Sequence, residues 1–355
     1  MNAEQRIKKL LLITAQEKAS DLHLSVARYP TLRIDGKLIP VPQEEILTND
    51  DIKEMCEVIL DEEKKKIFMD DGQVDFSYSL EDKVRFRVNA FFQQGNVSLA
   101  FRLIPRQIKN LEELNVPKNL YDFTKVSQGL VLIVGPTGHG KSTTLAALIN
   151  EINKTQEKNI ITIEDPIEYI YEQDRSIINQ REILQDAKSF HSALKAVFRQ
   201  DANVVLIGEM RDLDTISTAL TAAETGHLIL ATLHTNDSPQ TIDRIIDVFP
   251  AHQQSQVRSQ LANVLVAVIS QRLVPKIGEG RVPAVEIMIK NHAVENLIRE
   301  NKLYQIDNVI ETGSEEGMVT MDKSLVNLVK QGIVSPEVAL SYAKDQNNFE
   351  TLLKN

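Results

Sequence analysis

Residues 129–145 read GLVLIVGPTGHGKSTTL, and this stretch decides the fold class. An apolar run typical of a buried strand leads into a glycine-rich loop and then into the start of a helix. Gly135, Gly140, Lys141 and Ser142 match the phosphate-loop pattern, in which backbone N–H groups enclose the phosphates of a nucleotide. The lysine can reach the β and γ oxygens, and the serine hydroxyl can bind Mg²⁺. The expected contacts of ATP with Mg²⁺ are Gly135, Pro136, Thr137, Gly138, His139, Gly140, Lys141, Ser142 and Thr143.

His139 places an imidazole between two glycines of this loop. Two interpretations are open: the side chain contacts a phosphate or a neighbouring subunit, or it points out of a loop that its backbone holds. We favour the second, because the phosphate cradle is built from main-chain N–H groups.

Composition limits the class of protein. The chain has 355 residues, a net charge of −10 at pH 7 and one cysteine, Cys56. The length suits two domains of roughly 150 residues each. The acidic balance argues against a nucleic-acid partner, and the single cysteine excludes a disulfide framework or a multi-cysteine zinc site. A single cysteine also suits a reducing, cytoplasmic setting. Because no apolar run approaches the ~18 residues that span a membrane, we expect no direct membrane insertion.

Residues 1–104 are expected to form a small α+β unit. Residues 84–102 alternate apolar and polar side chains around the turn QQGN, which predicts a hairpin. Arg85, Arg87 and Arg102 would share its polar face, where they either bind an anion or form a solvated surface. Residues 105–124 contain two prolines and little periodicity, and we interpret them as a linker.

From about residue 125 apolar strands alternate with helical patterns, which predicts a parallel sheet with crossover helices. The apolar residues of SQLANVLVAVISQRL (residues 259–273) recur at helical spacing, so we expect a helix there. Beyond Pro275, residues 276–355 are expected to form a mostly helical subdomain.

Acidic residues follow two of the predicted strands. Glu209 ends the apolar run of VVLIGEMRD, where it could orient or deprotonate an attacking water or serve as a buried structural carboxylate. Glu164, Asp165 and Glu168 cluster in TIEDPIEY (residues 162–169). Carboxylates beside a triphosphate need Mg²⁺ or arginines to offset their charge; the alternative is a turn cluster around Pro166.

Two histidines flank the predicted strand of GHLILATLHT (residues 226–235). His227 and His234 stand at its opposite ends, so a shared metal ion is not expected. His234 lies at the carboxyl end, where ligands bind in such sheets, and is the better candidate for sensing the γ-phosphate. A histidine of the core is the other interpretation.

Five segments, in this order, resemble the secretion ATPase superfamily and within it the PilT-type retraction ATPases of the type IV pilus. They are GPTGHGKSTT (135–144), TIEDPIEY (162–169), FRQDANVVLIGEMRD (198–212), TAAETGHLILATLHT (221–235) and SQRLVP (270–275). RFRVNAF (85–91) and AVENLIRE (293–300) also match, so the resemblance covers nearly the whole chain.

The resemblance implies a PAS-like domain (1–104), a linker (105–124), a RecA-like ATPase core (125–275) and a helical C-terminal subdomain (276–355). It implies a homo-hexamer that uses ATP and Mg²⁺ to drive pilus retraction and twitching motility. The implied partners are the inner-membrane platform protein and cytoplasmic components of the pilus machine, and the implied location is the cytoplasmic face of the inner membrane at the base of that machine.

The resemblance also assigns roles to residues. Glu209 becomes the Walker B acid and water activator, His227 with His234 the histidine box, and Ala293 to Glu300 the tail motif tied to retraction. Glu164, Asp165 and Glu168 become the aspartate box, with Glu164 and Asp165 as candidate metal ligands, and Arg85, Arg87 and Arg102 become candidate arginine fingers.

The sequence departs from the family's usual motifs at two places. His139 replaces the usual serine of the phosphate loop, and Val294 and Glu295 replace an isoleucine and an arginine of the tail motif. The related extension and type II secretion ATPases are longer at the N-terminus and often carry a four-cysteine zinc motif, which favours the retraction branch here. The alternatives are an accessory retraction or assembly ATPase, a RecA-like DNA translocase, and a scaffold that binds ATP without turnover.

Overall fold

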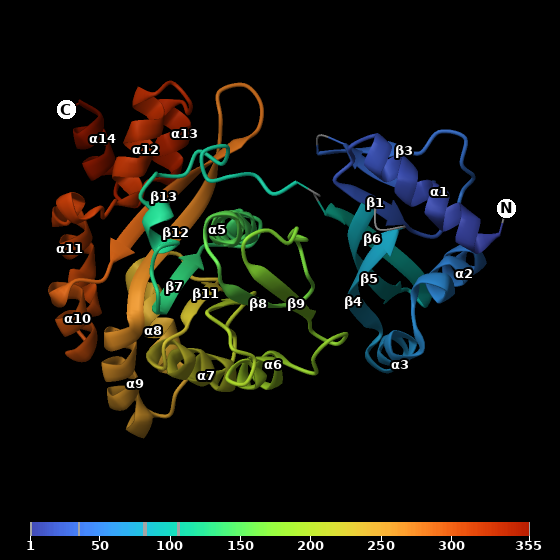
Figure 1. The fold of residues 1–355 in the computed structure, drawn as a ribbon. Coiled ribbons are helices and arrows are strands. Elements are labelled where there is room, and N and C mark those ends of the chain that lie inside the picture. The colour runs from blue at the N-terminus through green and yellow to red at the C-terminus, as the bar shows by residue number, and fades with distance from the viewer. Residues whose placement is uncertain (1, 35, 81–83, 105–106, 355) are drawn as a thin grey trace. The chain divides into compact units, whose positions relative to one another are not determined.

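The computed structural model describes residues 2–34, 36–80, 84–104 and 107–354. Pro105 and Arg106, the first residues of the expected linker, lie outside the described residues. The chain divides into two compact units (Figure 1). Unit 1 comprises Met1–Gln107 and Asp165–Ile170, and unit 2 comprises Ile108–Glu164 and Tyr171–Asn355.

Unit 1 is built on a six-stranded sheet in the order β3-β2-β1-β6-β5-β4, whose neighbours all pair antiparallel. Its strands are β1 (Asp21–Leu24), β2 (Thr31–Ile34), β3 (Lys37–Pro40), β4 (Gln73–Leu80), β5 (Val84–Gln93) and β6 (Asn96–Ile104). Its helices are α1 (Ala3–Gln16), α2 (Asn49–Ile59) and α3 (Glu62–Asp71). Polar side chains cap the starts of these helices. At α2, for example, Thr48 and Asp51 form a capping box.

The expected hairpin is the pair β5 and β6. Phe86, Val88 and Ala90 of β5 are fully buried, because successive strand residues point to opposite faces. Arg87 pairs with Arg102 across the ladder. Directly opposed residues share a face, so these two arginines and Arg85 lie on the face opposite the buried residues, as the alternation predicted.

Unit 2 is built on a seven-stranded sheet in the order β13-β12-β7-β11-β10-β8-β9. Its strands are β7 (Gly129–Val134), β8 (Asn159–Glu164), β9 (Ile177–Glu182), β10 (Val204–Ile207), β11 (Leu228–Leu233), β12 (Leu265–Pro275) and β13 (Arg281–Ile289). All neighbours pair parallel except β12 and β13. Every residue of β7, β10 and β11 is buried, which explains their uninterrupted apolar sequences.

Helices cover both faces of this sheet, with α5 on one side and α6, α7 and α9 on the other (Figure 1). The helices of this part are α4 (Leu120–Phe123), α5 (Lys141–Thr155), α6 (Phe190–Val197), α7 (Leu213–Glu224), α8 (Ser238–Asp247) and α9 (Ala251–Val264). The parallel sheet with crossover helices that the sequence predicted is therefore confirmed.

The helix expected over residues 259–273 is wrong beyond Val264. Helix α9 ends there and strand β12, between β13 and β7 in the sheet, begins at Leu265. The run VLVAVI fits both a helical period and a fully buried strand, and periodicity alone does not separate the two. Pairing with β7 on one side and β13 on the other decides for the strand.

The C-terminal region is mostly helical, as expected, but it opens with a strand that the sequence reading missed. Strand β13 pairs antiparallel with β12 and is buried along most of its length. The helices that follow are α10 (His292–Arg299), α11 (Ile306–Thr312), α12 (Met321–Lys330), α13 (Pro336–Tyr342) and α14 (Gln346–Lys354), with 3₁₀ turns at Leu303–Gln305 and Ser314–Glu316. Among the described residues, no helix combines the length and the apolar character needed to cross a membrane.

Replacing Phe86 with alanine should destabilise unit 1. The Phe86 ring is fully buried and packs edge-on against Phe101, with 6.2 Å between ring centroids. We expect the free energy of unfolding to fall by about 3–5 kcal/mol, measured by urea denaturation. The control Ile39→Ala removes a side chain that is 42% exposed and should cost less than about 1 kcal/mol; equal losses in the two variants would contradict this account of the core.

Candidate functional site

The phosphate loop connects β7 to α5, as the sequence predicted. Gly138 and Gly140 adopt left-handed backbone angles, with φ of 79° and 80°. Gly140 is the N-cap of α5, so the loop ends at a helix N-terminus whose N–H groups favour an anion.

The loop lies against strand β12. A Cβ atom added at Gly135 would lie 2.4 Å from the carbonyl oxygen of Gln271, closer than real Cβ atoms come to other atoms. The backbone of β12 therefore leaves no room for a side chain at Gly135, which accounts for the first glycine of the motif.

Lys141 is held inside the loop. Its side chain is 7% exposed, and its Nζ atom donates to the carbonyl oxygens of Gly135 at 2.8 Å and Pro136 at 3.1 Å. The same Nζ lies 3.3 Å from His234 Nδ1. The ammonium group thus stands at the mouth of the loop, where phosphate oxygens would bind.

His234 and Glu209 meet Lys141 because β7, β11 and β10 are neighbours in a parallel sheet, which brings their carboxyl ends together. His234 Nε2 lies 3.2 Å from Glu209 Oε2, and Arg211 donates to that oxygen at 2.6 Å. A line of polar contacts therefore runs from Lys141 through His234 to Glu209 and Arg211. Lys141, His234 and Glu209 were expected from the sequence. Arg211 was not, because its only signal in the sequence is its place two residues after Glu209.

The charge of Glu209 follows from its neighbours. Burial alone would raise the pKa of the Glu209 carboxyl, but the Arg211 hydrogen bond together with the charges of His234 and Arg211 lowers the pKa below its ordinary value. Glu209 is therefore a carboxylate at neutral pH, the form that orients or accepts a proton from water.

His139 faces β12, an arrangement that neither sequence interpretation contained. Its Nδ1 accepts a hydrogen bond from the Leu273 N–H at 2.9 Å, and its carbonyl oxygen accepts one from Gln271 Nε2 at 2.7 Å. Burial and the positive charges of Arg272, Arg281 and Lys141 lower the pKa of the His139 imidazole. The neutral ring keeps the lone pair that Leu273 requires.

The three acidic residues expected to form an aspartate box fall into different units. Glu164 ends β8 and is 8% exposed; its Oε1 accepts hydrogen bonds from Thr162 at 2.6 Å and Gln180 at 3.3 Å. Asp165 and Glu168 group with unit 1, in which Glu168 Oε1 lies 3.5 Å from Arg87 Nη1. Across residues 2–34, 36–80, 84–104 and 107–354, no group of three His, Cys, Asp or Glu side chains could hold a metal ion.

The other two arginines of the hairpin also have partners within unit 1. Arg85 donates to Ser77 Oγ at 2.6 Å, and Arg102 donates to Asp21 Oδ1 at 3.0 Å. The Arg102 side chain is nevertheless 70% exposed, so it is open to another anion.

One candidate residue and one candidate segment of unit 2 lie apart from the phosphate loop. His227 precedes β11, at the opposite end from His234, and its Nδ1 lies 3.0 Å from the Ala222 carbonyl oxygen. The tail motif Ala293 to Glu300 falls mainly on α10, where Glu295 pairs with Arg299 one turn later. Neither is brought to the line of polar contacts.

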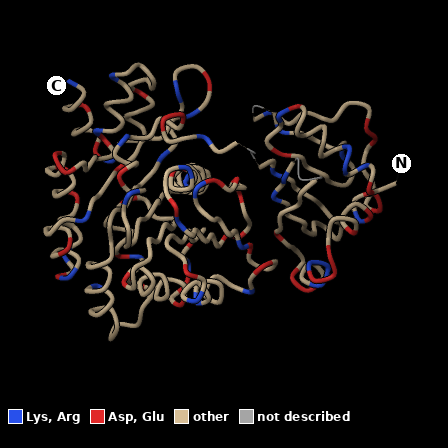
Figure 2. The backbone as a smooth tube through the Cα atoms, viewed as in Figure 1, with Lys and Arg blue, Asp and Glu red and all other residues tan. Residues whose placement is uncertain are grey.

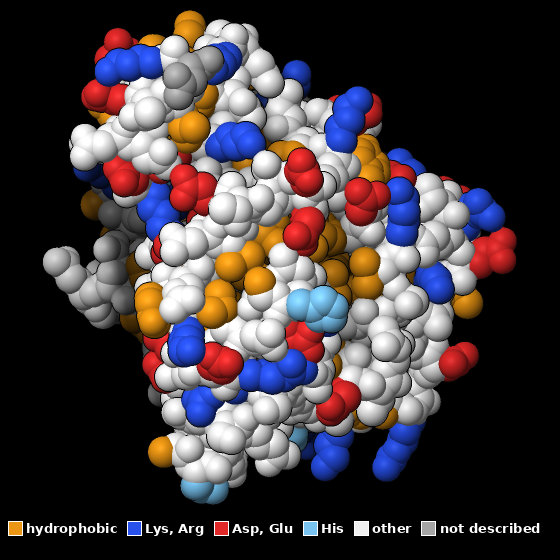
Figure 3. Space-filling view, turned by 90° about the vertical axis from the view of Figure 1, so that its left-hand side faces the viewer, with side chains coloured by type: hydrophobic (Ala, Val, Ile, Leu, Met, Phe, Trp, Pro, Cys, Tyr) orange, Lys and Arg blue, Asp and Glu red, His pale blue; other side chains and the backbone are white. Residues whose placement is uncertain are grey.

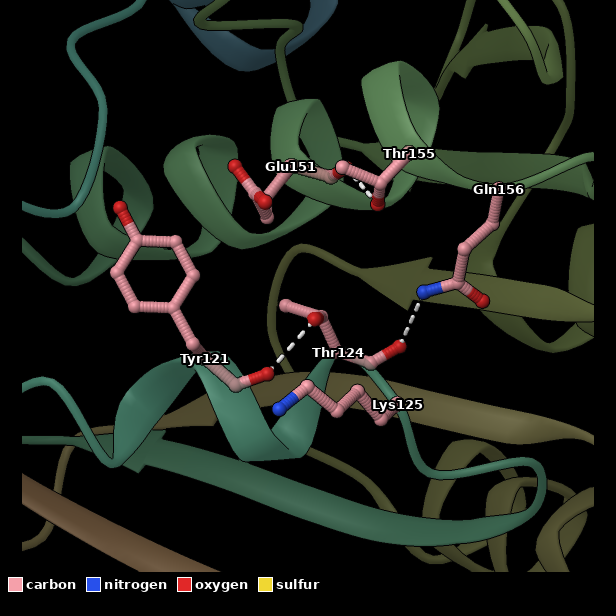
Figure 4. Close-up of a pocket in the computed structure, with 6 residues that line it drawn as sticks. All are labelled: Tyr121, Thr124, Lys125, Glu151, Thr155 and Gln156. Atoms are coloured by element: carbon pink, nitrogen blue, oxygen red, sulfur yellow. Dashed lines mark hydrogen bonds between the residues drawn. The ribbon is translucent and has the colours of Figure 1, made fainter.

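A pocket of about 360 Å³ lies at the C-terminal end of α5 (Figure 4). It is lined by Tyr121, Thr124, Lys125, Glu151, Thr155 and Gln156. The phosphate loop adjoins the other end of this helix, about 20 Å away at 1.5 Å per residue, so the pocket is separate from the nucleotide site.

The family described as "Type II/IV secretion system protein" matches residues 2–280. The chain is 45% identical over 345 residues to the "Type IV pilus retractation ATPase PilT" of Pseudomonas aeruginosa, covering 97% of this chain and 99% of that protein. It is 47% identical over 321 residues to a "Twitching motility protein" of Neisseria gonorrhoeae, covering 90% and 86%.

Among solved structures, the pilus retraction motor PilT with bound ADP superimposes with a TM-score of 0.89 at 43% identity, covering 97% of this chain and 99% of that one. The RecA-like α/β fold and the use of a nucleotide expected from the sequence are thereby confirmed. The chain is a P-loop ATPase, and it belongs to the type II/IV secretion system protein family.

Proposed function

We propose that this chain is a motor of a type IV pilus, a homo-hexamer that hydrolyses ATP to drive pilus retraction and so supports twitching motility. The observation that carries the proposal is the line from Lys141 through His234 to Glu209 at the carboxyl ends of adjacent strands. It stands in a chain nearly half identical, over almost its full length, to a protein named for pilus retraction.

The residues of the loop fit ATP together with Mg²⁺. The loop, which lies against β12 at Gly135, leads to the N-terminus of α5, where Lys141 offers an ammonium and Ser142 a hydroxyl. Ser142 would hold the metal ion, with Glu164 and Asp165 as further candidates. When bound, Mg²⁺ offsets the negative charge on the β and γ oxygens.

The protein residues then divide the work. Lys141 exchanges its contacts with the Gly135 and Pro136 carbonyls for phosphate oxygens. Glu209 orients the attacking water and accepts its proton, while Arg211 keeps that carboxylate charged. His234 lies between Lys141 and Glu209 and can respond to the γ-phosphate from that position.

The remaining assignments are part of the same proposal. We assign the PAS-like domain to residues 1–104, the linker to 105–124, the ATPase core to 125–275 and the C-terminal subdomain to 276–355. Arg85, Arg87 and Arg102 are proposed as arginine fingers for another subunit of the hexamer; their shared face and the exposure of Arg102 support this. His227 completes the histidine box, Glu164, Asp165 and Glu168 the aspartate box, and Ala293 to Glu300 couples the motor to the pilus base.

The proposed partners are the inner-membrane platform protein and the cytoplasmic components of the pilus machine, with the hexamer at the cytoplasmic base of that machine. A DNA translocase is the weaker candidate. Acidic and basic residues intermingle along both units (Figure 2), and they do so on the face formed by the C-terminal helices (Figure 3). Binding to DNA favours a basic surface, whereas this chain carries a net charge of −10.

Replacing Glu209 with glutamine should abolish hydrolysis and spare binding. The amide keeps the size of the carboxylate but cannot accept the proton of water, so Mg²⁺-ATP turnover should fall by about 100-fold or more. ADP affinity should stay within about threefold of wild type, since Glu209 lies beyond the phosphate loop. The control Glu279→Gln makes the same change at an exposed position; unchanged turnover in Glu209→Gln would remove Glu209 from its role.

Deleting the gene from its bacterium should leave surface pili that no longer retract. Motion of labelled pili and twitching at an agar surface measure this directly. Wild-type protein should restore retraction and Glu209→Gln should not. Cells without pili would identify an assembly motor, and normal retraction would identify an accessory one.

The His139 imidazole should titrate below pH 6.5, its ordinary pKa. Because folding lowers this pKa, the neutral ring supports the folded loop fully above about pH 6.5, and that support is lost as pH falls through the folded pKa. NMR spectra of histidine-labelled protein, with His139→Asn to identify the signal, give the midpoint. The melting temperature of wild type should also fall more than that of His139→Asn on acidification. A midpoint at or above pH 6.5 would contradict the contact with Leu273.

A further inference from the structure

Gln271 of β12 is a buried polar residue with both ends of its carboxamide paired. Its side chain is 2% exposed. Nε2 donates to the His139 carbonyl oxygen at 2.7 Å, and Oε1 accepts from Thr144 Oγ1 at 2.8 Å. His139 lies in the phosphate loop and Thr144 in the first turn of α5, so one side chain ties together the two segments that receive the phosphates.

The chemistry of the partners fixes which way this carboxamide faces. A carbonyl oxygen can only accept, so the amide nitrogen must point at His139. The Thr144 hydroxyl then donates to the remaining oxygen. A group in this place therefore has to offer a donor on one side and an acceptor on the other.

The contacts of Gln271 are part of a wider seam between residues 271–273 and the loop. The Gln271 carbonyl limits Gly135 to glycine, and the Leu273 N–H donates to the His139 ring at 2.9 Å. A Cβ at Gly140 would also lie 3.0 Å from Gln271 Nε2. The strand thus shapes the loop at both ends, and the carboxamide sets its distance from α5.

Burial of an amide is unfavourable unless its hydrogen bonds are made, and an apolar residue would fill the same space without that requirement. Both hydrogen bonds of Gln271 go to the nucleotide-binding segment. A nucleotide binds more tightly to a loop that is already ordered, because binding then costs less conformational entropy.

We propose that Gln271 is a positioning residue of the nucleotide site, whose carboxamide holds the phosphate loop and the first turn of α5 at the spacing that binds phosphates. Gln271 acts through His139 and Thr144 rather than by touching the nucleotide. The inference rests on the nucleotide site proposed above.

Gln271→Glu and Gln271→Met in the full chain test the proposal, with ADP affinity measured calorimetrically in the presence of Mg²⁺. At about pH 8 the glutamate carboxylate has no donor for the His139 carbonyl, so affinity should fall about 10-fold or more relative to wild type. At about pH 5.5 a protonated carboxyl donates to His139 and accepts from Thr144, and affinity should return to within about threefold of wild type. Methionine offers neither group and should bind weakly at both pH values.

The recovery on acidification separates positioning from simple damage to the fold, because a structural defect would not be repaired by one proton. Each variant is compared with wild type at the same pH, which cancels the titration of His139. Gln156→Glu is the matched control: the Gln156 carboxamide donates to the Thr124 carbonyl at 2.7 Å at the far end of α5 (Figure 4). Its ADP affinity relative to wild type should not change with pH.

Thr144→Val tests the same contact from the other side, should the Gln271 variants fail to fold. It keeps the shape of the side chain and removes the hydroxyl, and ADP affinity should fall about fivefold. The inference is overturned if Gln271→Glu binds as weakly as Gln271→Met at both pH values, or as tightly as wild type at about pH 8, or if Thr144→Val binds normally. Absence of ADP binding by the wild type would instead overturn the nucleotide site itself.

Discussion

The phosphate loop runs so close to β12 that one methyl group at Gly135 would lie 2.4 Å from the carbonyl oxygen of Gln271. The close approach of these two backbones places everything else in the site. It fixes the start of the loop, leaves Lys141 directed at the carbonyls of Gly135 and Pro136, and sets the height at which α5 begins. The strand order supplies the rest, since β12 stands on one side of β7 and β11 on the other.

The two sides of β7 contribute different things. On the β12 side, the contacts with Gln271 and Leu273 hold the loop in shape. On the β11 side, His234, which follows β11, and Glu209, which follows β10, bring ionisable groups to the mouth of the loop. Burial raises the pKa of the Glu209 carboxyl, but the hydrogen bond from Arg211 and the neighbouring His234 lower it, so the group stays ionised. Shape and charge are therefore supplied by separate strands.

The sequence was sufficient for the parts of this site that follow directly after an apolar strand. Glu209 and His234 follow the carboxyl ends of β10 and β11, and the loop that leads to Lys141 follows the carboxyl end of β7; the carboxyl ends of parallel strands meet. The sequence was insufficient for β12, because the apolar run after Val264 suits a helix as well as a strand. Only the pairing with β7 shows that it is a strand. Without β12, the sequence could predict neither the contacts of Gln271 nor the contact between the His139 ring and Leu273. Strand β13 was missed for a related reason, since Pro283 within it disfavours a strand and its pairing with β12 is tertiary information.

The strand that shapes the loop and the line that carries charge are also joined to each other. Arg272, the residue after Gln271, donates to Asn236 Oδ1 at 3.0 Å, and Asn236 lies two residues after His234. The phosphate loop is thus connected to His234 by two routes. One runs through Gln271, its neighbour Arg272 and Asn236, and the other runs directly through Lys141. Displacing the loop from β12 would therefore strain the position of His234, and moving His234 would act on β12. Because hydrogen-bond networks of this kind lose more than the sum of their single contacts when one member is removed, the phosphate loop and the His234 position are best regarded as one unit.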